Sequence, residues 1–122
     1  MKTDNIVQAK SYAFAVRIVR LYQHLSSERK EYVLSRQVLR CGTSIGANVE
    51  EAIGDQSRAD FIAKLSIAYK EARATSYWLR LLRDTDYLTP AQFDSLYMDA
   101  EELCRIIAAI QKTAKTSSEG HS

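Results

Sequence analysis

Hydrophobic residues recur every three or four positions in four successive stretches of the chain, and each stretch has the pattern of an amphipathic helix. Cap residues and glycines mark the limits of these helices. Thr3 or Asp4 is the expected cap of the first helix, and Gly54 is the expected end of the second. Ser57-Arg58-Ala59-Asp60 and Thr89-Pro90-Ala91-Gln92 have the form of capping boxes for the third and fourth. The pattern therefore predicts helices over residues 3–26, 29–53, 57–84 and 89–115.

Each predicted helix has one apolar stripe suited to a shared core. The loops between the helices are short, which favours antiparallel neighbours. We predict an all-α, antiparallel up-down-up-down four-helix bundle over residues 1–115, followed by a disordered polar tail over 116–122. The expected core residues are Val7, Phe14, Ile18, Leu21 and Leu25; Leu34, Val38, Cys41, Ile45, Val49 and Ala52; Phe61, Leu65, Ala68, Ala72 and Leu79; and Phe93, Leu96, Ala100, Leu103, Ile107 and Ile110.

The third helix is also apolar on the side opposite its core stripe. A helix with two apolar sides needs to be covered on both, and the chain has few other helices to do so. The first helix carries a smaller apolar patch away from its own core stripe. Both features predict a homo-oligomer. We call the first set the second apolar stripe (Ala63, Ile67, Ala74, Trp78 and Leu81) and the other the N-terminal apolar patch (Tyr12, Val16 and Val19).

Composition changes this picture little. The chain has 122 residues, and no apolar run approaches the roughly 18 residues that cross a bilayer. We therefore expect a cytoplasmic protein with no membrane partner. The two cysteines, Cys41 and Cys104, lie on apolar stripes, which favours reduced core thiols over a disulfide or a metal site.

Three residues of the second helix invite a packing interpretation. Gly42 and Gly46 lie one turn apart, and each costs the helix about 1 kcal/mol relative to alanine. Close approach of another helix explains that cost, and a bare backbone surface for a ligand is the alternative. Asn48 lies at the edge of the core stripe, where we expect its amide to fix the register between helices.

The residues needed for catalysis do not come together in this sequence. Bundle di-iron sites use Glu-x-x-His pairs, but the only histidines are His24 and His121, and Leu21 stands three residues before His24. No serine or cysteine has a histidine partner on the core side, and adjacent glutamates on a helix point about 100° apart. We therefore expect no enzymatic activity and no metal or other cofactor.

Positive charge is concentrated in the first third of the chain. Residues 1–40 contain eight Lys or Arg against three acids, whereas residues 41–122 contain nine against twelve. Several cations repeat along one line of the first helix, and two lie one turn apart on the second. Such a line suits contact with phosphates, or it forms a solvated edge paired with acids of the fourth helix. We call this set the basic stripe: Lys10, Arg17, Arg20, His24, Arg36 and Arg40.

Part of the sequence resembles a known bacterial family. The segments are RQVLRCGTSIGANVEEA at 36–52, Asp60-Phe61, IAYKEA at 67–72, Thr75 and YWLRLL at 77–82. They are similar to the four-helix-bundle proteins encoded in intervening sequences of 23S rRNA genes, also called the S23 ribosomal protein family, which includes accessory proteins of diversity-generating retroelements. The resemblance implies a ring, typically a pentamer, with no catalytic residues and a role linked to nucleic acid in some members. It also implies a protein partner such as a reverse transcriptase.

Two functional hypotheses follow. The first is a homo-oligomeric scaffold that binds RNA or DNA weakly and without sequence preference through the basic stripe. No aromatic residue of the first helix interleaves with its arginines, so phosphate contacts dominate this hypothesis. The second is a protein-interaction ring whose basic stripe docks an acidic protein partner and never contacts nucleic acid.

Overall fold

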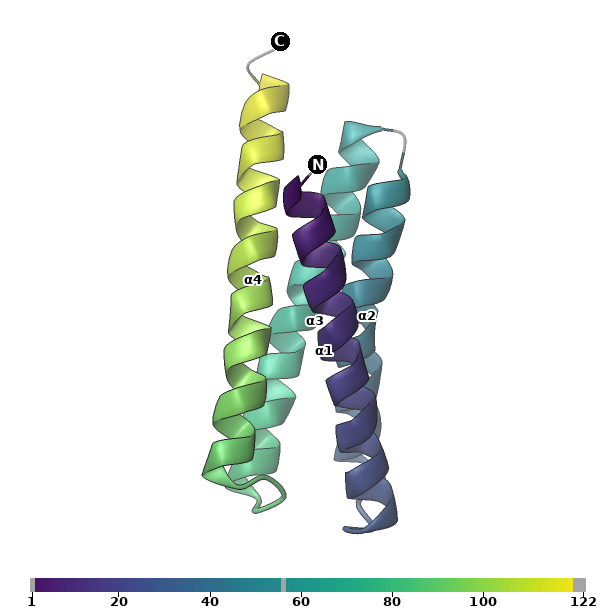
Figure 1. Ribbon diagram of the computed structural model, residues 1–122, viewed down its shortest axis with the longest axis vertical. Helices are drawn as coiled ribbons and strands as arrows, with labels where there is room; N and C mark the ends of the chain where they lie inside the picture. Colours follow the sequence, from purple (N-terminus) through teal and green to yellow (C-terminus); the bar gives the residue numbers. More distant parts are fainter. Residues whose placement is uncertain (1, 56, 120–122) are drawn as a thin grey trace.

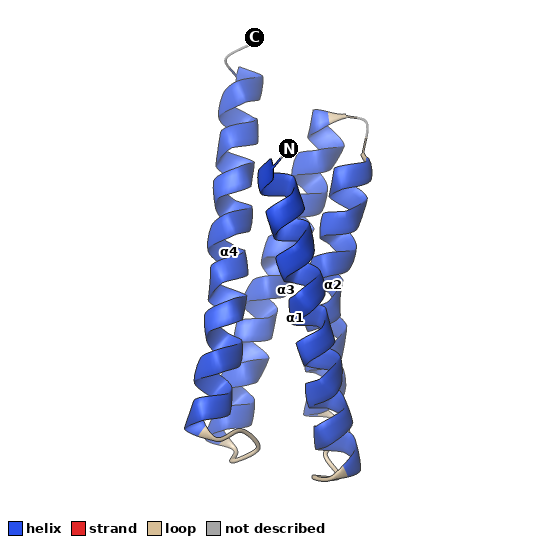
Figure 2. Cartoon of the chain, viewed as in Figure 1, coloured by secondary structure: helices blue, strands red, loops and turns tan. Residues whose placement is uncertain are grey.

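Four long helices run antiparallel, side by side, in a computed structural model that describes residues 2–55 and 57–119 (Figure 1). They are α1 (Lys2–Ser27), α2 (Leu34–Gly54), α3 (Arg58–Asp84) and α4 (Pro90–Glu119). Short loops connect them, and the described residues contain no strand (Figure 2). The prediction of an all-α four-helix bundle is confirmed.

Successive helices are neighbours in the bundle. α2 packs against both α1 and α3, α3 also packs against α4, and α1 meets α4 over a smaller area. Across the part of the chain that the structure describes, no close backbone contact joins α1 to α3 or α2 to α4. α1 and α3 therefore occupy diagonally opposite corners of the bundle.

The core consists of the residues that the helical pattern predicts. All the expected core positions of α1 and α4 are buried, as are those of α2 and α3 except for Leu34 and Phe61, which are half-buried. Leu82 and Leu88 complete this cluster at the end where α3 turns into α4. Both cysteines are buried and free, as predicted.

The two glycines of α2 allow α1 to approach closely. A methyl group added to Gly42 would lie 2.8 Å from Cγ1 of the buried Ile18. One added to Gly46 would lie 3.2 Å from the backbone oxygen of Ser11. Both glycines therefore face α1, which agrees with the helix-packing interpretation and leaves no bare backbone surface for a ligand.

α2 begins at Leu34, five residues after the predicted start at Arg29. In the loop after α1, the Glu31 N–H donates a hydrogen bond to the Leu25 carbonyl. Lys30 adopts the left-handed conformation there, with φ of 56°. The Glu31 carboxylate then accepts hydrogen bonds from the N–H groups at the start of α2, namely those of Val33, Leu34 and Ser35. This prediction was wrong because a buried glutamate caps α2 from outside the helix.

The outer limits of the bundle also differ from the prediction. α1 begins at Lys2, ahead of the expected cap at Thr3 or Asp4, and α4 continues to Glu119, beyond the expected end near Lys115. No glycine or proline interrupts the residues between Lys115 and Gly120, so local chemistry does not stop the helix there. The remaining residues of the expected tail, 120–122, lie outside the described residues. None of the described helices is long and apolar enough to cross a membrane.

Candidate interaction surfaces

Two cations of the basic stripe face α4 and meet acids there. Lys10 Nζ lies 3.1 Å from Glu102 Oε1. Arg17 Nη1 lies 2.6 Å from Asp99 Oδ2, and Arg17 Nη2 donates to Ser95 Oγ at 2.8 Å. These contacts join α1 to α4, the pair of neighbours with the smallest mutual contact. Part of the stripe therefore forms ion pairs with acids of α4, which is one of the two alternatives predicted for it.

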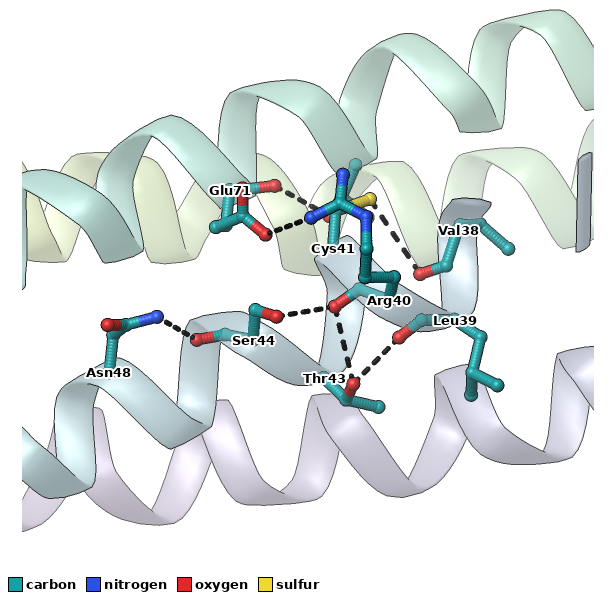
Figure 3. Close-up of polar contacts among 9 residues, drawn as sticks. Val38, Leu39, Arg40, Cys41, Thr43, Ser44, Asn48 and Glu71 are labelled. Atoms are coloured by element: carbon teal, nitrogen blue, oxygen red, sulfur yellow. Dashed lines mark hydrogen bonds and ion pairs between the residues drawn. The ribbon is translucent and has the colours of Figure 1, made fainter. Parts of the chain in front are cut away.

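The other four residues of the stripe differ in their acidic partners. His24 Nδ1 lies 3.1 Å from Glu28, and Arg40 Nη1 lies 3.1 Å from Glu71 on α3 (Figure 3). Arg20 and Arg36 are exposed, and among residues 5–55 and 57–116, whose side chains the structure describes, neither forms an ion pair or a side-chain hydrogen bond. These two arginines are therefore the residues of the stripe best able to bind an anionic ligand.

A groove between α1 and α4 brings together three predicted residues of the basic stripe. It is open to solvent and has a volume of about 300 Å³. Its cationic side comes from α1, and its apolar side comes largely from the start of α4 and the loop before it. This size is at the lower limit for small-molecule pockets. The residues lining this α1/α4 groove are Arg17, Arg20, Leu21, His24, Leu88, Gln92 and Leu96.

The second apolar stripe lies on the outward side of α3. Ile67 is 45% exposed and Ala63 is also exposed, whereas Ala74, Trp78 and Leu81 are half-buried. Trp78 also packs against the core, so it belongs only in part to the surface. The stripe thus leaves apolar area on the bundle that no other helix of the chain covers.

The N-terminal apolar patch is exposed on α1. Tyr12 is 68% exposed, and Val16 and Val19 are also exposed. Because α1 and α3 are diagonal in the bundle, the patch and the second apolar stripe face different directions. The chain therefore presents two separate apolar surfaces.

Asn48 does not fix the register between helices as predicted. Its Nδ2 donates to the carbonyl of Ser44 at 2.8 Å, one turn earlier on the same helix (Figure 3). The half-buried amide is thereby satisfied locally. An interhelical contact is made instead by Thr75 of α3, whose hydroxyl donates to Cys41 Sγ at 3.3 Å.

A further surface on α3 was not predicted as a site. Lys70, Arg73, Tyr77 and Arg80 are all exposed and are spaced three or four residues apart. That spacing places them along one face of the helix. This spacing is present in the sequence, but positive charge is less concentrated there than in residues 1–40.

Comparison with known proteins finds a family model and a solved structure that are similar to this chain. A family model described as 23S rRNA-intervening sequence protein matches residues 3–109. A crystal structure of a protein with unknown function from the S23 ribosomal protein family of Bacteroides thetaiotaomicron is 55% identical, with a TM-score of 0.89. The similarity covers 90% of this chain and 98% of that one. No curated protein matches the chain.

Proposed function

The chain belongs to the 23S rRNA-intervening sequence protein family, and we propose that it is a non-enzymatic scaffold that assembles with copies of itself into a ring. The ring, a pentamer by family resemblance, binds RNA or DNA weakly and without sequence preference. The observation that carries this proposal is the pair of exposed apolar surfaces on the diagonal helices α1 and α3.

Two different apolar surfaces on one chain suit head-to-tail assembly. In such an interface, the second apolar stripe of one copy packs on the N-terminal apolar patch of the next. An open assembly then keeps one free stripe at one end and one free patch at the other, and the series of contacts ends only when the ring closes. A symmetric dimer would bury one surface against itself and leave the other exposed to water.

A ring also multiplies the weak positive charge of one chain. The formal net charge is only +2, and Lys10, Arg17 and Arg40 already have acidic neighbours. Arg20 and Arg36 form no ion pair with the described side chains, and assembly repeats them in every copy. Because affinity for a polyanion rises steeply with the number of phosphates contacted, the ring binds more tightly than a single chain.

The α1/α4 groove favours a second candidate function. It combines an apolar floor of leucines with Arg20 and His24 at its edge. An acidic, amphipathic protein segment has the complementary chemistry. In this alternative, the ring docks a protein partner and does not bind nucleic acid.

A mixing experiment tests the head-to-tail interface directly. Ile67→Glu places a charge in the second apolar stripe, and Val16→Glu places one in the N-terminal apolar patch. Each variant alone should be a monomer with native helical content, because one of its two contact surfaces is blocked. Mixed in equal amounts, the two variants should form a one-to-one dimer, since each supplies the surface that the other lacks.

Light scattering of the two variants and their mixture distinguishes the outcomes. A dimer that appears only on mixing supports head-to-tail assembly. If neither substitution changes the mass of the native assembly, these surfaces are not the interface. A monomeric native protein would contradict the proposal as a whole.

A further inference from the structure

One face of α3 presents three cations and an aromatic ring in a single line. Lys70, Arg73, Tyr77 and Arg80 are exposed, and Tyr77 has an arginine one turn before it and another one turn after it. Arg73 and Arg80 are separated by seven residues, or about 10 Å along the helix axis. This is the interleaving of arginine and aromatic residues that α1 lacks.

The acids next to this line are engaged elsewhere. Glu71 is paired with Arg40 of α2, and Asp84 is paired with Arg83 at 2.8 Å. Among the described residues, Lys70, Arg73 and Arg80 form no ion pair. Arg80 also acts electrostatically on Asp84, so Lys70 and Arg73 have the charge most available to an anionic ligand.

α4 contributes a further exposed arginine within electrostatic range of the same thiol as Arg73. Arg73 and the exposed Arg105 of α4 both lie close enough to Cys104 to act electrostatically on its thiol. Glu101 also acts electrostatically on that thiol, and its carboxylate accepts a hydrogen bond from Ser76 at 3.1 Å. We call Lys70, Arg73, Tyr77, Arg80 and Arg105 together the tyrosine-arginine surface.

The ring of Tyr77 is held in place while much of it remains accessible. It meets the ring of Trp78 edge to face, with centroids 5.2 Å apart and planes at 80°. The Arg80 guanidinium lies 5.9 Å from the Tyr77 ring centroid. Even so, Tyr77 is 49% exposed. A ring fixed in this way loses little conformational entropy when a planar group stacks on it.

We propose that the tyrosine-arginine surface binds single-stranded nucleic acid, with a base stacked on Tyr77 and the flanking phosphates bound by Arg73, Arg80 and Arg105. The bases of a duplex are stacked on one another and cannot reach an aromatic side chain, whereas those of a single strand can. This inference rests on the nucleic-acid part of the proposed function. It moves the principal contact from the basic stripe to α3.

The test compares two single strands of equal length and charge: labelled oligothymidylate and a fully abasic oligonucleotide. The variants are Tyr77→Leu, which removes the ring, and the double variant Arg73→Gln, Arg80→Gln, which removes two cations. Tyr32→Leu is the matched aromatic control, because Tyr32 is 48% exposed in the loop before α2. Lys112→Gln, Lys115→Gln is the matched charge control near the end of α4. Every variant is first shown by light scattering to keep the native mass.

Stacking on Tyr77 predicts a specific pattern of losses. Tyr77→Leu should weaken oligothymidylate binding at least about fivefold and leave the abasic strand unaffected, since base stacking on an aromatic contributes at that level or above. The double arginine variant should weaken both strands and make the dependence on salt shallower. Both control variants should bind as the native protein does. Emission from Trp78, the only tryptophan, should change when the native protein binds oligothymidylate, and not in the Tyr77→Leu variant.

Two results overturn the inference, and they are distinguishable. If the native protein binds but Tyr77→Leu and Tyr32→Leu both leave the affinity unchanged, the contact is not at Tyr77, while nucleic-acid binding by the scaffold stands. If the native assembly fails to bind either strand at low salt, the nucleic-acid part of the proposed function fails as well. The surface then has the charge suited to an acidic protein.

Discussion

Gly42 of α2 lies directly against Ile18 of α1, so that even a methyl group at position 42 would come within 2.8 Å of Cγ1 and 2.9 Å of Cγ2 of that isoleucine. Ile18 is fully buried, and its β-branched side chain is stiff at χ1, so it does not easily turn away. Gly42→Ala should therefore destabilise the protein by about 1–3 kcal/mol, as overpacking of a core does, despite the better helix propensity of alanine. Urea denaturation followed by circular dichroism measures this difference.

Gly54→Ala is the control for that substitution. Gly54 ends the same helix, and an added methyl group there would meet nothing within 4 Å. Its φ is not positive, so alanine fits the backbone. This variant should be neutral or more stable by up to about 1 kcal/mol. Equal effects at positions 42 and 54 would show that the α1–α2 contact does not require glycine.

Glu31 should make stability depend on pH. Burial raises the pKa of its carboxyl, but hydrogen bonds from the backbone N–H groups of Leu34, Ser35 and Val33 outweigh burial and lower its pKa below the ordinary value. The stabilisation is therefore present above the unfolded-state pKa, and it is lost as pH falls through the lower folded-state pKa. Glu31→Gln should cost about 1 kcal/mol at pH 7, a typical value for loss of a helix cap.

Denaturation curves of native protein and Glu31→Gln between neutral and strongly acidic pH test this account. The difference between the two proteins should shrink as the pH falls through the lowered folded-state pKa of Glu31, because the native carboxylate then becomes protonated. A difference that stays constant over the whole range would mean that the charge of Glu31 does not act as the cap.

The two thiols should be inert in the folded protein. Burial raises the pKa of both Cys41 and Cys104, so little thiolate is present, and it also shields both sulfur atoms from thiol reagents in solution. Ellman's reagent should label neither cysteine in native buffer and both in guanidinium chloride. Rapid labelling of one thiol under native conditions would show that its part of the core opens readily.

Local signals in the sequence predicted most of the fold. The Ser57 hydroxyl accepts the Asp60 N–H at 3.1 Å, and Thr89 and Gln92 bond reciprocally at 2.9 and 3.1 Å, as capping boxes do. The start of α2 escaped prediction because Glu31 reaches it from a loop, and glutamate in such a loop is not a recognised start signal.

The contacts of the basic stripe could be predicted only in part. The seven-residue spacing of Lys10 and Arg17 correctly placed both on one side of α1. Which acids they meet depends on the rotation of α4, about which the sequence of α1 contains no information. The spacing of Lys70, Arg73, Tyr77 and Arg80 is present in the sequence, but whether that face is exposed depends on which sides of α3 the other helices cover.

The two kinds of arginine in the basic stripe should behave differently. Arg20→Gln, Arg36→Gln removes cations that form no ion pair with the described side chains, and it should weaken binding of any nucleic acid while leaving stability unchanged. Lys10→Gln, Arg17→Gln also removes ion pairs to α4, so it should lower stability by about 0.2–1 kcal/mol per pair.

Filter binding over a range of salt concentrations compares the two double variants. Loss of one phosphate contact on a single strand reduces the slope of log affinity against log salt by about 0.7. If Arg20→Gln, Arg36→Gln leaves both the slope and the affinity unchanged, the free arginines of the stripe take no part in binding.

The mass of the native protein in dilute solution tests self-assembly most directly. Light scattering at micromolar concentration should give a multiple of the 13.8 kDa chain mass, with five copies the number implied by family resemblance. A different multiple would change only the count. A mass of 13.8 kDa would show that the apolar surfaces of α1 and α3 remain uncovered in solution, and it would contradict the account.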